Sequence, residues 1–102
     1  MGVREEERRK ELNDIRDQME TAQGRRVIWR LLEAGKVFST TFNAEALSMA
    51  FLEGHRNIAL SFLADVMDVA PKKFNVMMLE AKERREIVKA LLEKEREAEN
   101  VD

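Results

Sequence analysis

The sequence predicts an all-α protein, a small bundle of about four helices with a charged helical arm at each end. It contains one proline, Pro71, and four glycines in 102 residues, so the turns that strands and hairpins need are almost absent. Apolar residues recur at intervals of three and four along most of the chain, which is the helical spacing. With 44% apolar and 37% charged residues, the chain has the composition and length of one globular domain.

The first helix is expected over residues 3–20, in an N-terminal arm of residues 1–22. Its apolar side chains Leu12, Ile15 and Met19 are three and four apart and form one narrow stripe. Oppositely charged pairs four apart, such as Glu5 with Arg9, add only a few tenths of a kcal/mol each. This segment therefore needs a partner surface to remain helical.

A helical core is expected over residues 23–81, starting with a helix over residues 21–34. Gly35 follows at the position where a left-handed residue often ends a helix. Residues 36–41 have the composition of a connector. The side chains expected to reach the core from this region are Val27, Ile28, Leu31, Leu32, Val37, Phe38 and Phe42, with Trp29 beside them.

The third helix is expected over residues 44–68, with Asn43 as its N-cap and Gly54 as a point where it bends or divides. Its apolar residues at helical spacing are Leu47, Phe51, Ile58, Phe62, Met67 and Val69. Pro71 ends this helix, because proline disfavours helical backbone at the preceding residue, and it begins a fourth.

The fourth helix is expected to leave the compact body after Ala81. Its apolar face includes Phe74 and Met77, then thins where Arg84 and Arg85 interrupt it, and is restored at Val88. Residues 82–102 are therefore a charged C-terminal extension.

The two terminal stripes are the candidate partner or oligomer interface. They are longer than a three-helix core can cover, and exposed stripes of this kind are usually buried by each other, by a second copy or by a larger assembly. We therefore expect a homo-oligomer. The candidate interface residues are Leu12, Ile15, Met19, Val88, Leu91 and Leu92.

The composition and the absence of known motifs argue against several classes of function. The chain has no cysteine, which excludes disulfides and thiolate metal sites. No apolar run approaches the ~20 residues of a membrane span, so we expect a cytosolic setting without a membrane partner. His55 is the only histidine, and Asp65 with Asp68 is more typical of capping than of cation binding. Since no catalytic or phosphate-binding motif is present, we expect no enzyme, catalytic residue, cofactor, metal or small-molecule substrate.

Basic residues are concentrated locally, although the formal net charge of the chain is −2. A converging basic surface could contact phosphates, weakly and in a salt-dependent manner. A solvated rim, or salt bridges to the many acids, is the alternative. The candidate basic residues are Arg25, Arg26, Arg30, Arg56, Lys72 and Lys73.

Three separated blocks carry a family resemblance. Residues 24–33 read GRRVIWRLLE, residues 35–38 read GKVF, and residues 53–60 read EGHRNIAL. In order and spacing they resemble a family of short tailed-bacteriophage proteins first delineated in a Bordetella phage, whose pattern is GRRVLWRLL, GVF and EGRRNVGL. The resemblance covers residues 23–79, and His55 stands where the family commonly has arginine.

The resemblance implies a product of the head-morphogenesis and portal region of a phage genome. It leads us to expect a non-enzymatic structural or assembly protein of the virion, present in the host cytoplasm during assembly. Its partners would be portal or internal head proteins, with a contact to packaged DNA as a further option. The alternative is a small DNA-binding or host-takeover regulator that uses the basic residues.

Overall fold

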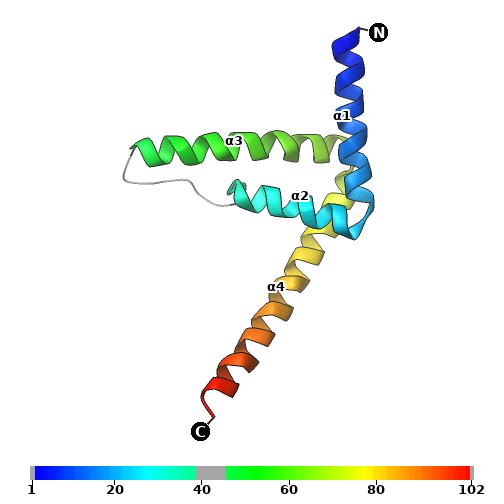
Figure 1. Cartoon of the computed structure of the whole chain (residues 1–102). Coiled ribbons are helices and arrows are strands. Elements are labelled where there is room, and N and C mark those ends of the chain that lie inside the picture. Colours follow the sequence, from blue (N-terminus) through cyan, green and yellow to red (C-terminus); the bar gives the residue numbers. More distant parts are fainter. Residues whose placement is uncertain (1, 39–45, 102) are drawn as a thin grey trace.

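The computed structural model describes residues 2–38 and 46–101, and every regular element in this part of the chain is helical. The helices are α1 (Val3–Glu20), α2 (Ala22–Ala34), α3 (Ala46–Val69) and α4 (Pro71–Glu99) (Figure 1). The all-α prediction is confirmed, and α4 begins at Pro71 as predicted. The predicted N-cap Asn43 and the core candidate Phe42 lie outside the described residues.

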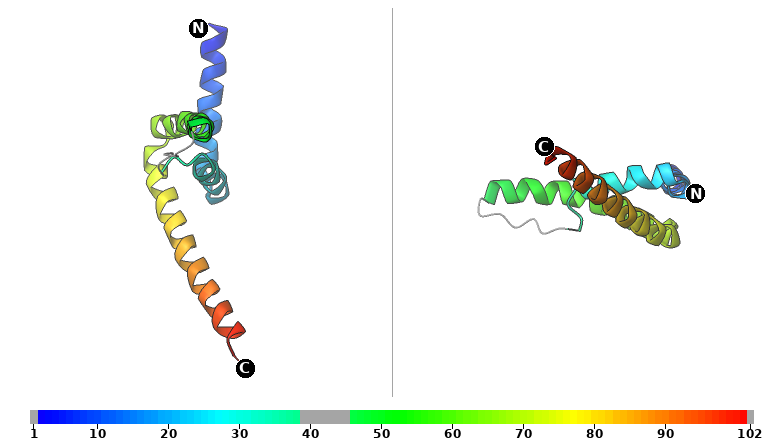
Figure 2. Two further views of the ribbon diagram at one scale, coloured as in Figure 1. Left: turned by 90° about the vertical axis from the view of Figure 1, so that its left-hand side faces the viewer. Right: turned by 90° about the horizontal axis from the view of Figure 1, so that it is seen from below.

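The four helices form a small body from which the two termini extend in opposite directions. In Figure 1, α2 and α3 run alongside each other, α1 crosses them near one end, and α4 leaves from the same end; Figure 2 shows the same arrangement from two further sides. The Cα radius of gyration is 18.0 Å and the extents are 70 × 39 × 16 Å. A compact domain of this length would have a radius of gyration of about 13 Å, so the molecule is elongated.

The corner between α1 and α2 depends on Thr21 and Gly24. The Thr21 side chain caps α2 by accepting a hydrogen bond from the backbone N–H of Gly24 at 3.0 Å. A Cβ atom on Gly24 would lie 1.9 Å from the carbonyl oxygen of Gln18. Glycine is therefore required here because the backbones of α1 and α2 approach so closely.

Gly35 has a different role from the one predicted. Its φ is −83°, and the residue with positive φ is Lys36, at 58°. A Cβ atom on Gly35 would lie 2.2 Å from the Cβ atom of Ala59 on α3. The missing side chain lets the end of α2 approach α3, while the left-handed turn falls one residue later.

The core lies where the four helices meet, and the side of α3 that faces it matches the prediction only in part. Of the predicted residues, Phe62 and Val69 are partly buried and pack against the core. The buried side of α3 contains Ala59, Val66 and the adjoining Ala70, whereas Phe51, Ile58 and Met67 are exposed. Small alanine side chains allow the helices to approach closely. The face of α3 that packs inward therefore depends on side-chain size as well as on the spacing of apolar residues. The buried apolar residues are Ile15, Met19, Ile28, Trp29, Leu32, Val37, Ala59, Val66, Ala70, Met77 and Ala81.

Two further core predictions are corrected in and after α2. Val27 is exposed, because α2 turns Ile28 and Leu32 inward instead. Phe38 is about half exposed, yet its ring stacks on buried Trp29 with centroids 5.2 Å apart. α3 runs as one helix through Gly54 and is not divided there.

Candidate functional site

The apolar stripe of α1 is covered within a single copy of the chain. Met19 and Ile15 are buried and Leu12 is partly buried. The Arg8 guanidinium makes a bidentate ion pair with the Asp65 carboxylate of α3, which raises the pKa of Arg8 above its usual range. Ile15 and Met19 are thus not available to a partner, contrary to the expectation, because the corner at Gly24 folds α1 back onto the other helices.

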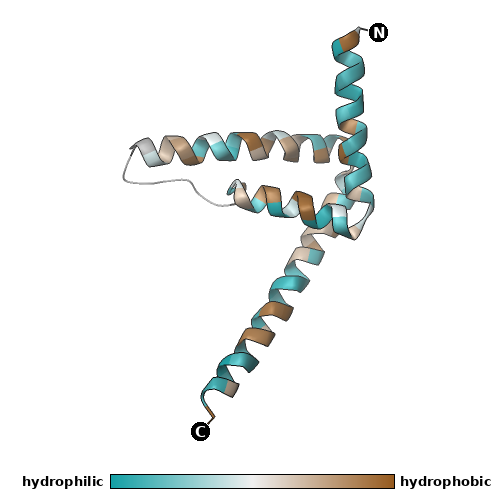
Figure 3. Cartoon of the chain, in the orientation of Figure 1, coloured by the Kyte–Doolittle hydropathy of each residue, from teal (hydrophilic) through white to brown (hydrophobic). Residues whose placement is uncertain are grey.

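The apolar stripe at the end of α4 is not covered in this way. Among residues 82–101 none is buried, and the side chains of Ile87, Val88, Leu91 and Leu92 are between 52% and 60% exposed. Apolar bands continue along this part of α4 in Figure 3. We call residues 82–99 the free half of α4.

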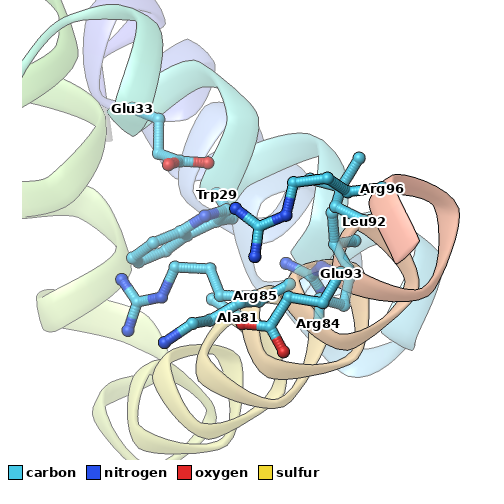
Figure 4. A pocket seen from close by; sticks show the side chains of 10 residues that line it. Trp29, Glu33, Ala81, Arg84, Arg85, Leu92, Glu93 and Arg96 are labelled. Carbon is cyan, nitrogen blue, oxygen red and sulfur yellow. The ribbon is translucent and has the colours of Figure 1, made fainter. Parts of the chain in front are cut away.

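A groove lies where the free half of α4 diverges from α2. It has a volume of about 710 Å³, and Trp29 and Glu33 of α2 form one wall. The other wall is α4, which contributes the apolar side chains Ala81, Val88 and Leu92 (Figure 4). We call this feature the α2–α4 groove; its remaining lining residues are Arg84, Arg85, Lys89, Glu93 and Arg96.

The chemistry of the α2–α4 groove suits an amphipathic helix with acidic side chains. The indole of Trp29 and the aliphatic side chains of α4 offer apolar contact, while four basic side chains against two acidic ones line the same groove. This combination supports burial of an apolar face and recognition of carboxylates at its edges.

His55 lies outside this groove, on α3, and the centroid of its ring is 4.4 Å from the centroid of the Phe51 ring.

Arg25, predicted for a basic surface, is instead an internal structural residue. It is 8% exposed and joins α2 to α4 through Glu80: its Nε donates to Glu80 Oε1 at 2.7 Å and its Nη2 to Oε2 at 3.1 Å. Its Nη1 donates to the carbonyl oxygen of Met19 at 2.8 Å. One guanidinium thus connects the end of α1, the start of α2 and the last covered turn of α4.

The contact between Arg25 and Glu80 shifts the pKa values of both side chains. The hydrogen bonds from Arg25 hold the pKa of the Glu80 carboxyl below its usual value, against the effect of burial, and the same bonds raise the pKa of Arg25. Sequence reasoning missed this pair because arginine is rarely buried unless it is paired, and Glu80 is 55 residues away in the chain.

The other predicted basic residues lie on three different helices, and Arg26 among them helps to lower the pKa of Glu80. Arg26 and Arg30 are exposed on α2, Lys72 is exposed and Lys73 partly buried in the first turn of α4. Arg56 on α3 is half-buried and its Nη2 donates to the Val37 carbonyl oxygen at 3.5 Å, beyond the opposite end of α2 from Arg25. The basic side chains that line one common feature are Arg84, Arg85, Lys89 and Arg96 of the α2–α4 groove. None of these four was predicted as part of a basic surface.

Residues 2–38 and 46–101 contain neither a cluster of metal-binding side chains nor a membrane-spanning helix. No three histidine, aspartate or glutamate side chains in these ranges are grouped to hold a metal ion. No helix described here has both the length and the apolar character of a membrane span.

Comparison with known proteins places this architecture in a phage family. The family model described as Bbp19-like phage protein matches residues 15–78, well over half of the chain. No curated protein and no solved structure matches it. The matched range includes the buried stripe end of α1, all of α2 and the first turns of α4, and it ends before the free half of α4. The chain therefore belongs to the family of Bbp19-like phage proteins.

Proposed function

We propose that the chain is a non-enzymatic structural or assembly protein of a tailed-phage particle. In this proposal it is an oligomeric helical module that docks at the portal vertex or in an internal, ejection-type core assembly. Its partners are further copies of itself and portal or internal head proteins, with packaged DNA nearby. Its place is the virion, after assembly in the host cytoplasm.

The observation that carries the proposal is the uncovered apolar row on the free half of α4. Four branched aliphatic side chains there are more than half exposed in one copy. Burial of apolar surface contributes roughly 25 cal/mol per Å², and contiguous exposed patches typically mark interaction sites. A helix without tertiary cover is also marginal in water. A partner that covers this row would stabilise both the row and the helix.

Particle assembly makes modest contacts sufficient. Symmetric rings repeat one contact in every copy, so the summed affinity greatly exceeds that of a single contact. The α2–α4 groove supports a binding role rather than catalysis, because its polar residues are arginine, lysine and glutamate around an apolar wall.

The DNA-binding or host-takeover regulator is the alternative. It retains exposed Arg26, Arg30 and Lys72, but it loses Arg25 to the internal pair with Glu80. It requires DNA affinity that falls steeply between low and physiological salt, whereas the structural module requires little DNA affinity at any salt concentration.

Mass spectrometry of purified intact particles tests the proposal. We expect the chain to be present in a fixed number of copies, and Leu92→Asp to reduce its incorporation at least tenfold. Leu79→Asp is the matched control, since Leu79 is also on α4, is 62% exposed, and does not line the α2–α4 groove. Absence of the wild-type chain from particles, or equal loss with both variants while circular dichroism stays helical, would contradict the proposal.

A further inference from the structure

We propose that two copies of the chain pair through the free halves of α4 in antiparallel orientation, each placing its residues 93–99 along the α2–α4 groove of the other. This inference rests on the self-association included in the proposed function, and it adds the occupant of the groove and the geometry of the pair.

The charge distribution of the free half identifies the occupant and its direction. Residues 82–89 carry four basic and two acidic side chains, whereas residues 93–99 carry two basic and four acidic ones. An antiparallel pair places the basic segment of each copy against the acidic segment of the other. A parallel pair would place like charges together, which disfavours association.

The apolar residues define the register of the pair. Ala81, Val88 and Leu92 all line the groove, and their spacing of seven and four places them on one helical face. With Val88 of one copy opposite Leu92 of the second, Arg85 lies opposite Glu95 of the second copy and Ala81 opposite its Glu99. Leu91 and Ile87 lie along one edge of the same contact.

The groove gives the incoming helix a second wall. The acidic end of the second copy reaches Ala81, where Trp29 and Glu33 of α2 stand across the groove from Arg84 and Arg85 (Figure 4). At 1.5 Å per residue, the 18 residues of the free half give an overlap of about 27 Å. Because both copies use the same surface, the contact is isologous and closes as a dimer.

Cross-linking of the full chain tests the orientation, and the absence of native cysteine makes it clean. In the proposed register, Arg84 lies beside position 95 of the second copy, while two copies of position 84 are about 18 Å apart. A short thiol cross-linker, with a span of about 8 Å, should therefore join an Arg84→Cys chain to a Glu95→Cys chain in an equimolar mixture. Neither variant alone should cross-link to itself.

The outcomes separate the geometry from the proposed function. Arg84→Cys chains that cross-link among themselves overturn the antiparallel pair. A dimer seen by light scattering without the mixed product also overturns this geometry, while self-association stands. A wild-type chain that stays monomeric at high concentration overturns this inference, and particle mass spectrometry then tests docking separately.

A charge-reversal series provides the second measurement. Arg85→Glu with Lys89→Glu makes the basic segment acidic, and Glu95→Lys with Glu97→Lys makes the acidic segment basic; all four side chains are exposed. Each double variant alone should dimerise roughly tenfold more weakly than wild type, and an equimolar mixture should recover most of the loss. Wild-type affinity for either double variant alone would overturn the charge pairing.

Discussion

α1 and the free half of α4 are similar helices with different surroundings. Each is rich in charge and carries an apolar stripe, formed by Leu12, Ile15 and Met19 in α1 and by Ile87, Val88, Leu91 and Leu92 in the free half of α4. In α1 these side chains are turned into the body, with Met19 fully buried, whereas Val88, Leu91 and Leu92 of α4 are exposed. The corner at Gly24 folds α1 back onto the core, while α4 continues as a helix past its last buried residue, Ala81. The connection to the rest of the chain, and not the stripe itself, determines which stripe remains available to a partner.

The largest expected effect concerns the covered stripe. Met19→Ala should lower the free energy of unfolding by about 2–5 kcal/mol, because it leaves a cavity at a fully buried site. Met67→Ala is the control, since Met67 is 45% exposed and should cost less than about 1 kcal/mol. Urea unfolding followed by circular dichroism measures both, and equal losses would contradict the role assigned to α1.

The corner that folds α1 back gives the next effect. Gly24→Ala should destabilise by about 1–3 kcal/mol, because its Cβ atom would collide with the Gln18 backbone. Gly54→Ala should have the opposite sign and stabilise by about 0.5–1 kcal/mol, since its Cβ atom meets nothing within 4 Å in the interior of α3. Thermal unfolding distinguishes the two; a stable Gly24→Ala variant would mean that the corner is not tightly packed.

The Arg25–Glu80 pair gives a smaller, pH-dependent effect. Glu80→Gln should lower the free energy of unfolding at pH 7 by about 1–2 kcal/mol, through loss of charged hydrogen bonds. Because folding lowers the pKa of Glu80, the stabilisation is fully present above the ordinary value of 4.5 and is lost as pH falls through the lowered pKa. The variant and wild type should therefore converge in acid.

Glu83→Gln, at an exposed position on the same helix, serves as the control for this titration. Its difference from wild type should be small at every pH. A wild-type minus Glu80→Gln difference that does not change between pH 7 and pH 3 would show that the pair does not control the titration.

The smallest effect on folding is expected in the uncovered stripe. Leu91→Ala with Leu92→Ala should change the unfolding free energy by no more than about 0.5 kcal/mol per residue, measured at concentrations where the chain is monomeric. The same double variant should abolish self-association in sedimentation or light scattering. Leu79→Ala, on another face of α4, should change neither quantity appreciably. Full self-association by the double variant would remove the basis for the comparison.

The helices could be predicted from the sequence, but their faces only in part. Pro71 marks the end of α3 and the start of α4, and the scarcity of glycine favours helix elsewhere. Both are local effects on the backbone, so they can be predicted from the sequence. The buried side of α3 could be predicted only in part: Phe62 and Val69 do pack against the core, but exposed Phe51 and Ile58 follow helical spacing equally well. Which face is buried depends on how closely two helices approach, and that depends on residues distant in sequence, such as Gly35 against Ala59.

The α4 side of the candidate site was predicted from the sequence, whereas the α2 side was not. Val88 and Leu92 were identified from the interruption of the apolar face, which is a local signal. Trp29 across the groove, and the use of Arg25 by Glu80 rather than by a partner, follow from the angle between α2 and α4. No pattern within either helix specifies that angle.

The Arg25–Glu80 pair lies at the base of the free half of α4, so small rotations there are amplified at the end of the helix. Glu80 is in the last covered turn of α4, and the end of the helix at Glu99 lies about 28 Å beyond it. A rotation of about 5° at Glu80 would therefore displace the end of the helix by about 2.5 Å, enough to disrupt the register of a packed contact. The ion pair between α2 and α4 thus controls the direction of the free half of α4, although it lies outside that segment.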